Sequence, residues 1–406
     1  MIRVGIIGGG PAGIAASISA SRCGAKAIIF ERTKSVLNKF VLSGGGRCNI
    51  SNKNISADFY NGGSKNFINN VLKGFRTQDI LDFLRDIGSS YFVEEDGRIF
   101  TGDSKDTSYK LIKYTISLGT KIYYKSFVEK IEKIGDSFSV RYKGVESSFD
   151  KVIVATGGKS FPETGSDGFG YLIAESLGHT IIHPLPGLVS LDLKPNPFAG
   201  LQGVTIEASI YLENRSLGIH ETMSGKLLFT HRGISGPLAR NISGRLIRLS
   251  REKGTMVYLN LVPGFTRERL DMEIQTEIRT SGRKKLVNLI NRFIPDRLAI
   301  RILSESGIPP ERVLAELKRD ERIRLVENLT NMRINISGSR GFKTAHITTG
   351  GVSCDEIRSS TMESKIVKGL YFAGEILDVD GLEGGYNLHW AFATGFIAGK
   401  SAASLK

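Results

Sequence analysis

The sequence lacks several features that mark specialised classes of protein. Its three cysteines show no CxxC spacing and no even framework, so neither structural disulfides nor a zinc or other metal site is predicted, and a reducing cytoplasm is the expected location. The longest apolar run carries Asn387, His389 and Lys400, so it predicts a buried helix and not a membrane span. Met1 leads straight into the first expected strand, which leaves no room for a signal peptide. The chain also contains no repeat and no low-complexity segment.

The composition is that of an ordinary globular protein with a basic surplus. Of the 406 residues, 40% are hydrophobic and 24% are charged, and this length predicts two or three domains with substantial cores. The 55 Lys and Arg exceed the 41 Asp and Glu by 14. Such a surplus favours contact with nucleic acid, an anionic membrane or an acidic substrate. Because the acids are interspersed with the bases, a solvated surface is the preferred interpretation.

The N-terminal segment carries the strongest functional signal. An apolar run over residues 2–7 predicts a buried parallel strand, and it leads into the glycine turn Gly8–Gly13. Small residues then continue at helical spacing as far as Cys23, and Lys26–Phe30 predicts a second buried strand that ends in Glu31. Strand, glycine turn, helix, strand and acid, in this order, are the fingerprint of a dinucleotide-binding βαβ unit.

The residues of this turn have separate expected roles. Gly8 permits the tight turn, Gly10 lets the backbone approach a pyrophosphate, and Gly13 lets the helix pack closely on the strand. Glu31 is placed to accept a hydrogen bond from a ribose 2′-hydroxyl. A 2′-phosphate about 4 Å away would cost several kcal/mol at an effective dielectric constant near 20, a repulsion that Arg32 would soften. The turn therefore predicts FAD or NAD and disfavours NADP.

The segment Ser43–Asn52 contains three consecutive glycines followed by Arg47 and Cys48. A nest of backbone N–H groups beside a cation is suited to an anion, whereas a flexible surface loop is the alternative interpretation. The spacing is not that of a P-loop. For Cys48, a buried inert thiol and a reactive thiol are both open.

The remaining chain predicts alternating helices and strands and one clear boundary. Prolines cluster between residues 184 and 197, strand alternation follows from about 188 to 262, and the pattern turns helical and heavily charged from about 266 to 330. This predicts an inserted strand-rich domain that carries a helical subdomain. Before the boundary, the expected elements are helices at 64–88 and 104–118, a hairpin at 91–100, strands at 121–125, 127–134, 137–143 and 151–154, and a helix ending at Gly178.

Glycine turns return near the C-terminus. A short buried strand ends in Gly374 and Glu375, and the segment Gly384–Asn387 precedes a helix of small residues. A second helix N-terminus at a ligand would suit the anionic N1/O2 edge of a reduced flavin. The far end of the chain therefore favours FAD over NAD.

Together these segments resemble the two-part FAD domain of the glutathione-reductase-like flavoproteins, in which the first βαβ unit holds ADP and a C-terminal Gly-Glu/Asp-Gly segment closes over the flavin. More narrowly, the sequence is similar to the BaiN/YhiN-type flavoprotein family, often labelled aminoacetone-oxidase-family FAD-binding enzymes. The Ala155–Gly168 segment also resembles one in fumarate-reductase-type flavoproteins, which points to C=C reduction. Five segments spanning nearly the whole chain carry the narrower similarity: Gly8–Gly13, Ser43–Asn52, Ala155–Tyr171, Phe229–Pro237 and Tyr371–Gly395.

The resemblance implies both the fold and the cofactor contacts. The expected fold is α/β, a discontinuous Rossmann-like three-layer FAD-binding domain with an inserted β-barrel-like domain and a helical subdomain. The expected boundaries are 1–187 and 346–406 for the FAD-binding domain, 188–262 for the strand-rich insert, 263–330 for the helical subdomain and 331–345 for the return strand of the insert. FAD is expected to bind non-covalently, and beside Gly8, Gly10 and Gly13 the expected contacts are Pro11, Ala12, Glu31, Arg32, Arg47, Cys48, Asn49, Val128, Ala155, Thr156, Gly157, Gly374, Glu375, Asp380, Gly381, Gly385, Tyr386 and Asn387.

The expected function is that of an FAD-dependent oxidoreductase that exchanges a hydride with a small organic substrate, at a C=C or an amine group. No second strand–GxGxxG–helix unit follows the first, so NAD(P)H is expected at most as a transient reductant in the substrate cleft. His231 lies in the glycine-rich segment Phe229–Pro237 of the insert, which is expected to cover the flavin. It is the candidate catalytic acid; His346, His389 and Tyr386 can also transfer protons, and His389 or Tyr386 is the next candidate.

Two other classes of function stay open. The charge of +14 and the basic stretch Arg245–Lys253 favour a tRNA-modifying flavoprotein, although no aromatic-and-basic RNA motif accompanies them. A non-catalytic flavin-binding redox sensor that uses Cys48 is the second alternative. A small-molecule substrate is the preferred partner.

Overall fold

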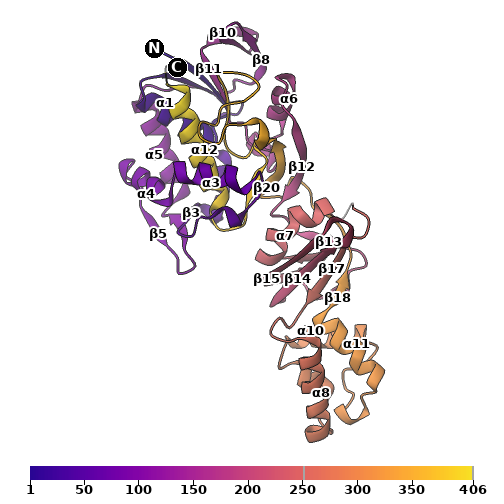
Figure 1. Cartoon of the computed structure of the whole chain (residues 1–406). Coiled ribbons are helices and arrows are strands. Elements are labelled where there is room, and N and C mark those ends of the chain that lie inside the picture. Colours follow the sequence, from indigo (N-terminus) through magenta and orange to yellow (C-terminus); the bar gives the residue numbers. More distant parts are fainter. Residues whose placement is uncertain (250–251, 405–406) are drawn as a thin grey trace. The chain divides into compact units, whose positions relative to one another are not determined.

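The computed structural model describes residues 1–249 and 252–404, and the chain forms two compact units (Figure 1). Unit 1 combines Met1–Leu185 with Phe342–Lys406, so both ends of the sequence contribute to it. Unit 2 is the continuous segment Pro186–Gly341, which interrupts unit 1 in the sequence.

Unit 1 is built on a five-stranded parallel sheet. Its strands are short runs of β-branched and aromatic residues that are buried on both faces, as expected for a parallel sheet covered on both sides. The strand order is β21-β11-β1-β2-β7, and every neighbouring pair is parallel. The bounds are β1 (Arg3–Ile7), β2 (Lys26–Phe30), β7 (Lys121–Tyr123), β11 (Lys151–Val154) and β21 (Leu370–Phe372).

Helices cover one face of this sheet and an antiparallel meander covers the other. Ile6 of β1 faces α1, while a Cβ at the adjacent Gly5 would touch Phe149 of the meander. Phe149 also packs edge-on against Phe30 of β2, with ring centroids 5.7 Å apart. The Rossmann-like three-layer fold is confirmed. The bounds are α1 (Pro11–Arg22), α5 (Ser104–Ser117) and α12 (Tyr386–Ala402) for the helices, and β8 (Val128–Ile134), β9 (Ser137–Tyr142) and β10 (Val145–Phe149) for the meander.

Smaller elements surround the sheet of unit 1 and carry much of the candidate site. They pair as β3-β6-β5, β4-β22 and β12-β20, and the first of these contains the expected hairpin. The bounds are α2 (Asn38–Leu42), β3 (Asn49–Asn52), β4 (Tyr60–Gly62), α3 (Lys65–Gly74), α4 (Thr77–Asp86), β5 (Tyr91–Val93), β6 (Arg98–Thr101), α6 (Phe169–Ser176), β12 (Ile181–Gly187), β20 (Ile347–Val352) and β22 (Val379–Gly381).

The single helix expected over residues 64–88 was wrong, because α3 and α4 are separate helices. The break falls at Phe75, whose backbone is extended with φ −154° and ψ 108°. The next helix then starts afresh, since the carboxylate of Asp79 accepts a hydrogen bond from the backbone N–H of Arg76 (2.6 Å). An acid at the third helical position satisfies an N-terminal amide that would otherwise lack a partner.

Unit 2 contains a seven-stranded antiparallel sheet. Its longest strands alternate between buried apolar and exposed polar residues, which is the pattern that predicted a strand-rich insert. The strand order is β18-β17-β14-β15-β16-β13-β19. The bounds are β13 (Leu191–Leu193), β14 (Thr205–Asn214), β15 (Ile219–Thr230), β16 (Gly233–Ser235), β17 (Met256–Asn260), β18 (Met332–Ile334) and β19 (Ile336–Ser339).

A helix that the sequence analysis missed covers one face of this sheet. α7 (Gly236–Leu249) lies within the stretch that was expected to be rich in strands. Its buried residues Leu238, Ile242 and Leu246 recur every four positions, which is helical spacing. They pack on the sheet beside β15, and a Cβ at Gly225 would lie 3.8 Å from the Cβ of Leu238.

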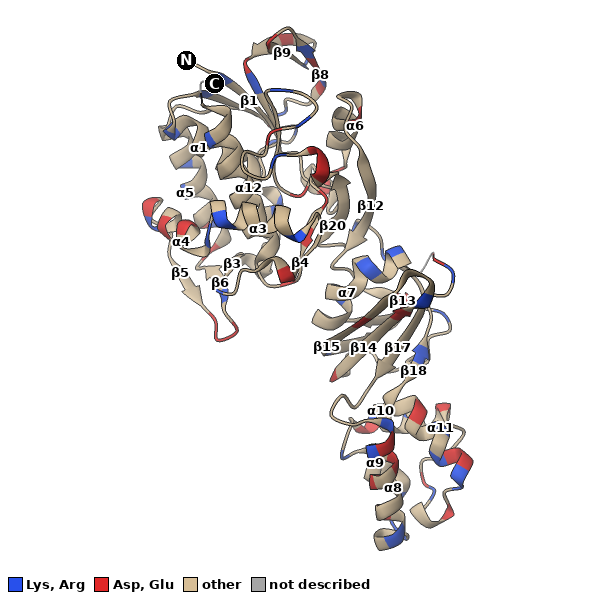
Figure 2. Ribbon diagram, in the orientation of Figure 1, with Lys and Arg blue, Asp and Glu red and all other residues tan. Residues whose placement is uncertain are grey.

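The rest of unit 2 is helical, as the charged pattern from residue 266 predicted. Lys and Arg alternate with Asp and Glu on these helices (Figure 2), and many form ion pairs, such as Arg322 with Asp271 at 2.7 Å. No helix among the described residues is long and apolar enough to cross a membrane. The bounds are α8 (Arg267–Ser281), α9 (Leu286–Ile290), α10 (Asp296–Glu305) and α11 (Arg319–Thr330).

Candidate functional site

The glycine turn after β1 leaves the start of α1 open to a ligand. Gly8 has φ +103°, and a Cβ there would lie 2.5 Å from the carbonyl oxygen of Ala155. A Cβ at Gly13 would lie 1.9 Å from the carbonyl oxygen of Gly8, so only glycine lets α1 begin this close to β1. A Cβ at Gly10 would meet no protein atom within 4 Å, and no side chain caps the helix there. With Pro11 at its first position, α1 presents free N-terminal amides and the positive end of its dipole.

Glu31 at the end of β2 faces this turn. Its carboxylate is buried and accepts hydrogen bonds from the backbone N–H groups of Gly9 (2.9 Å) and Thr33 (2.7 Å). Each bonded oxygen keeps a lone pair for a further donor, such as a ribose hydroxyl. The neighbouring Arg32 forms an ion pair with Asp167 (2.6 Å), so its charge is already compensated within the protein. Arg32 would therefore do little to offset the electrostatic repulsion between a 2′-phosphate and the carboxylate of Glu31.

The remaining residues expected at the ADP end follow β7 and β11. Val128 is buried as the first residue of β8, and the N–H of Ala155 bonds to the carbonyl oxygen of Ile7 (2.8 Å), which continues the pairing of β11 with β1. The chain then turns at Gly157, where φ is +72°. Between them, the hydroxyl of Thr156 is buried and has no hydrogen-bond partner among the described residues. A buried hydroxyl without a partner is rare, and a ligand group is one way to satisfy it.

Close contact between α12 and α1 joins the two ends of the chain. A Cβ at Gly395 would lie 2.3 Å from the carbonyl oxygen of Ala12, and one at Gly399 would lie 2.1 Å from that of Ala16. Four residues further along α12, the contact lies four residues further along α1, so the two helices are parallel. α12 begins at Tyr386, nine residues before Gly395, whereas α1 begins one residue before Ala12, so the N-terminus of α12 projects about 12 Å beyond the start of α1 at 1.5 Å per residue. The two helix N-termini are thus spaced along one direction, which suits an extended ligand.

The C-terminal glycine turn touches the same pair of helices. A Cβ at Gly374, where φ is +83°, would lie 2.8 Å from the Cβ of Ala12 in α1. The N–H of Gly374 bonds to the hydroxyl of Thr394 in α12 (2.9 Å). Glycine turns that the sequence separates by more than 350 residues therefore meet at one place in unit 1.

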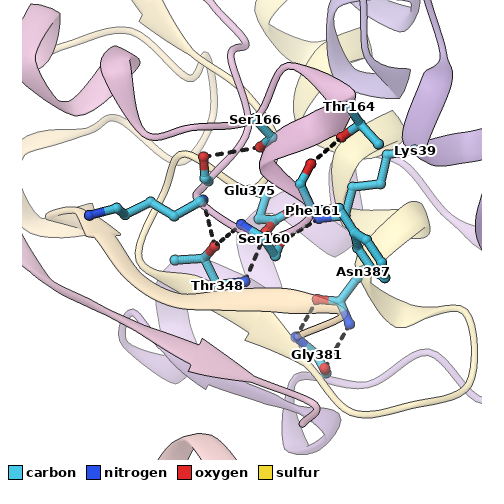
Figure 3. A network of polar contacts seen from close by, with 11 residues as sticks. Lys39, Ser160, Phe161, Thr164, Ser166, Thr348, Glu375, Gly381 and Asn387 are labelled. Atoms are coloured by element: carbon cyan, nitrogen blue, oxygen red, sulfur yellow. Dashed lines mark hydrogen bonds and ion pairs between the residues drawn. The ribbon is translucent and has the colours of Figure 1, made fainter. Parts of the chain in front are cut away.

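A polar network ties four separate segments of unit 1 together (Figure 3). The ammonium of Lys39 in α2 lies 2.6 Å from one carboxylate oxygen of Glu375 and 2.6 Å from the hydroxyl of Ser160. The other carboxylate oxygen of Glu375 accepts hydrogen bonds from Ser160 (2.7 Å) and from the backbone N–H of Thr348 in β20 (2.8 Å). We call these four residues the Lys39–Glu375 network.

Sequence reasoning identified only one member of this network, Glu375. Lys39 lies 336 residues away from it, Ser160 lies 215 residues away, and Thr348 lies 27 residues away. No periodicity or motif in one sequence reports a contact at such separations. The glycine pair shortly before Ser160 was an indirect sign in the sequence that another segment packs closely there. In the structure that segment contains Thr348, whose hydroxyl would lie 2.3 Å from a Cβ at Gly158.

The segment between β21 and α12 is held by two further sets of hydrogen bonds. The amide of Asn387 accepts from the N–H of Gly381 (2.8 Å) and donates to its carbonyl oxygen (2.7 Å), as Figure 3 shows. The carboxylate of Asp380 accepts from the hydroxyl of Thr349 and from the side-chain amide of Asn61 (3.1 Å). Expected contact residues of the flavin end thus fix the loop that leads into α12.

In the Ser43–Asn52 segment the three glycines all have left-handed backbone, with φ of +59° at Gly44, +65° at Gly45 and +91° at Gly46, and β3 begins at Asn49. The cation of this segment does not stand free beside the glycines. Arg47 forms an ion pair with Glu94 (3.1 Å), and its guanidinium lies 4.5 Å from the ring centroid of Phe100. The charge is compensated by the β5–β6 hairpin, which differs from the expected anion nest with an available arginine.

Cys48 and Asn49 lie in environments that give them structural roles in unit 1. Cys48 is fully buried, and burial raises the pKa of its thiol to about 12, so the thiol is protonated at neutral pH. A redox sensor based on Cys48 therefore loses its support, because the thiolate is the reactive form. In the orientation that satisfies its hydrogen bonds, the amide oxygen of Asn49 accepts from the N–H of Gly385 (3.1 Å), the residue that precedes α12.

The candidate proton donors differ sharply in their environment. His389 is fully buried between the hydroxyl of Ser51 (2.9 Å) and the carbonyl oxygen of Phe75 (3.3 Å), and burial lowers its pKa to about 4. It is a neutral structural residue at physiological pH. Burial raises the pKa of the Tyr386 phenol, so that group keeps its proton. His231 belongs to unit 2, where it is exposed in the turn between β15 and β16.

Comparison with known proteins identifies the family. A model of the HI0933-like protein Rossmann domain matches residues 2–401 of the chain. The chain belongs to this family. The resemblance to BaiN/YhiN-type flavoproteins, inferred from five sequence segments, is confirmed.

Two relatives match this HI0933-like protein over almost their full length. The 3-dehydro-bile acid delta(4,6)-reductase of Clostridium scindens is 34% identical over 409 residues, which cover 99% of each chain. The ribosomal RNA dihydrouridine synthase of Escherichia coli is 31% identical over 405 residues, which cover 99% of this chain and 98% of the relative. The 3-ketosteroid-delta4-(5alpha)-dehydrogenase of Rhodococcus jostii RHA1 aligns with a TM-score of 0.52 at 16% identity, over 100% of this chain and 97% of that one, and supports the fold. The protein is an FAD-dependent oxidoreductase.

Proposed function

We propose that this protein uses FAD to reduce a carbon–carbon double bond that is conjugated to a carbonyl group. The observation that carries the proposal is the shared chemistry of two full-length relatives. A 3-dehydro-bile acid has a ketone at C3, and its delta(4,6) double bonds are conjugated to it. Dihydrouridine is uridine whose C5=C6 bond, next to the C4 carbonyl, has been reduced. The substrates differ greatly, but the reacting group is the same.

We propose further that unit 1 holds the FAD. The ADP end would lie at the glycine turn Gly8–Gly13 and at Glu31, and the flavin end at Glu375 and the start of α12. The open space at Gly10, the buried Glu31 carboxylate and the unpartnered Thr156 hydroxyl support this assignment. When bound and reduced, FAD supplies a hydride, and NADH or NADPH is the proposed source of those electrons.

The chain itself has to orient the substrate and deliver a proton. Hydride addition at the β-carbon moves the double-bond electrons toward the carbonyl oxygen, and a proton must then be added at the α-carbon. His231 in unit 2 is the proposed donor. Tyr386 is the alternative, because its phenol is protonated at neutral pH. The buried position and low pKa of His389 favour a structural role for it.

Anaerobic flavin spectroscopy tests the reaction class. The holoprotein is reduced with NADH or NADPH and then mixed with a 3-oxo-4-ene steroid or with the same steroid lacking the double bond. We expect the conjugated ketone to reoxidise the flavin and the saturated control to leave it reduced. Failure of every conjugated acceptor, with rapid reoxidation by oxygen alone, would overturn the proposal.

Two single variants separate the proposed proton donors. His231→Ala should leave FAD bound and slow reoxidation by the conjugated ketone about 10²–10⁴-fold if His231 is the general acid. Tyr386→Phe should give that loss instead if Tyr386 is the acid. Reduction by dithionite, which needs no substrate proton, should be normal in both variants.

A nucleobase in RNA is the second candidate substrate, and the distribution of charge favours it. Residues 186–341 carry 25 Lys and Arg against 16 Asp and Glu, so unit 2 holds +9 of the net charge of +14. Figure 2 marks Lys and Arg positions in blue along the ribbon of α7, which includes most of the basic stretch Arg245–Lys253; residues 250 and 251 of that stretch lie outside the described part. A basic surface supplies the salt-dependent part of RNA affinity.

The open face of the unit 2 sheet adds aromatic side chains that the sequence analysis missed. Tyr211 of β14 lies opposite Tyr258 of β17, and Tyr258 lies opposite Arg333 of β18. This row is on the face away from α7, and Tyr211 is 37% exposed. Neighbouring aromatic rings on a sheet beside an arginine provide a stacking surface for unpaired bases.

Binding of a fluorescent single-stranded uridine oligoribonucleotide tests this second candidate. Its affinity should fall steeply with salt, and the double variant Tyr211→Ala/Tyr258→Ala should weaken it about 10-fold or more, since one stacked base contributes about 1–3 kcal/mol. Tyr109→Ala, which removes an exposed tyrosine from unit 1, is the matched control. Equal affinity of all three proteins would exclude the sheet as an RNA-binding surface.

A further inference from the structure

The Lys39–Glu375 network differs from an ordinary surface ion pair. The side chains of Lys39 and Glu375 are 27% and 21% exposed, and the hydroxyl of Ser160 bridges them, so the three groups form a closed ring of short contacts. Exposed pairs contribute little because water solvates both charges and the side chains are free to move. Here each charge has at least two protein partners, and both side chains are restricted.

The network also joins the segments that carry the FAD fingerprints. Lys39 lies in α2, four residues before the Ser43–Asn52 segment, and Ser160 follows the glycine turn after β11. Glu375 follows Gly374, which touches Ala12 in the first turn of α1. The carboxylate of Glu375 is therefore fixed from three directions, by an ammonium, a hydroxyl and a backbone amide.

We propose that Lys39 is a positioning residue of the FAD site, which neutralises Glu375 and holds its carboxylate in the orientation that binds the cofactor. An acid at this position is useful because it accepts hydrogen bonds from the hydroxyl groups of the ligand. FAD, however, carries a negatively charged diphosphate, and a carboxylate without a partner would repel it. Lys39 removes this conflict, and the carboxylate oxygen of Glu375 that it contacts keeps one lone pair for a hydroxyl group of the ligand.

The inference rests on FAD binding in unit 1 and not on the proposed C=C reduction. Its test therefore measures FAD affinity of the apoprotein by flavin fluorescence, without a substrate. Lys39→Met removes the charge and keeps the length of the side chain, and we expect it to raise the Kd for FAD about 10-fold or more, the loss typical of a charge-assisted contact. Lys39→Arg keeps a cation and should stay within about 3-fold of the wild type.

Lys159→Met is the matched control for the loss of one positive charge near the site. Lys159 is adjacent to Ser160 in sequence, but its ammonium lies over the ring of Phe342 at 5.4 Å from the centroid. Its side chain makes no contact with Glu375 among the hydrogen bonds and ion pairs of the described residues. This variant should bind FAD with nearly the wild-type Kd.

A double-mutant cycle separates positioning from a general loss of stability. If Lys39 acts by neutralising Glu375, then Lys39→Met/Glu375→Gln should bind FAD no more weakly than Lys39→Met alone, because no uncompensated carboxylate is left. The melting temperature of each apoprotein reports whether the fold is intact. Unchanged Kd in Lys39→Met, or an equal loss in Lys39→Arg and Lys159→Met, would overturn the proposal and leave the reaction class untouched.

Discussion

Two pairs of helices in this protein are held together by opposite means. In unit 1, α1 and α12 approach so closely that Gly395 and Gly399 face backbone carbonyl oxygens directly. In unit 2, α8 and α11 pack through Leu, Ile and Val side chains and are bridged by an ion pair between Asp271 and Arg322. The first contact depends on the absence of side chains and the second on their presence.

The difference teaches where substitutions are tolerated. A backbone carbonyl oxygen cannot move aside without disturbing its own helix. A Cβ added at Gly395 or Gly399 would therefore push α1 and α12 apart. Charged side chains in the α8–α11 contact can rotate toward water when a partner is removed. The first contact positions the proposed cofactor site, and the second supports a subdomain to which no fingerprint was assigned.

The largest effect is expected from Gly395→Val. The Cβ alone would lie 2.3 Å from the carbonyl oxygen of Ala12, so α12 must shift away from α1. We expect a loss of at least about 3 kcal/mol in stability, at the upper end for overpacking, and loss of bound FAD. Urea unfolding and flavin absorbance of the purified protein measure both.

The control for this variant is Gly264→Val in unit 2. A Cβ at Gly264 would meet no atom within 4 Å, and its φ is not positive, so valine fits there. Stability and flavin content should match the wild type. A Gly395→Val protein that kept its flavin and its stability would refute the role assigned to the glycine contact.

The second effect concerns the buried His389 of α12 and depends on pH. Its pKa is about 4 in the folded protein and about 6.5 in the unfolded chain, so protons favour the unfolded state below pH 6.5. This residue should lower the free energy of unfolding by about 3 kcal/mol as the pH falls from 6.5 to 4. His389→Gln should show a weaker decrease in urea unfolding over that window, and an identical slope would mean that His389 is accessible to protons when folded.

A smaller effect is expected from Arg322→Met in the α8–α11 contact. The ion pair with Asp271 is partly buried, with side chains 18% and 26% exposed, so its loss should lie between the values for exposed and buried pairs, about 1–2 kcal/mol. Flavin content should not change. Loss of flavin in this variant would show that the two helix pairs are energetically coupled.

The smallest effect is expected from Arg324→Met, two residues further along α11 than Arg322. Arg324 bonds to Asp320 at 2.9 Å and donates a long hydrogen bond from Nε to the carbonyl oxygen of Ser306 (3.3 Å), but the side chains of Arg324 and Asp320 are largely exposed. Water and salt screen such a pair, so urea midpoints of variant and wild type should agree within error. A clear loss of stability here would place Arg324 in a wider network than its contacts show.

The parts of the fold that the sequence predicted are those with a local signal. β1, β2 and β11 are continuous apolar runs because both faces of a parallel sheet are buried, and the turn Gly8–Gly13 reports a close backbone approach directly. The break at Phe75 was missed although Gly74, a residue type that often marks the end of a helix, stands directly before it. α7 was missed because polar and charged residues interrupt its apolar spacing within a strand-rich stretch.

The candidate site was predictable to the same degree. Glycine turns and Glu31 are readable locally, since their residue types are set by the backbone and by the ligand. The environments of Cys48, Arg47 and His389 were not readable, because burial and ion pairing depend on segments far away in the sequence. The partners of Glu375 were not readable for the same reason, since all of them are distant in the sequence.

The contact between α1 and α12 has a consequence for how the chain folds. α1 is synthesised first and α12 last, with all of unit 2 between them, so the contact closes a loop of almost the entire chain. Such distant contacts form late and slow folding, because the entropy of loop closure must be overcome before they stabilise anything. During synthesis, the first βαβ unit must therefore wait for its partner helix, with the small apolar side chains of α1 uncovered. Unit 2 has its own continuous sequence and can fold in the meantime, whereas the proposed FAD site is complete only after α12 has been synthesised.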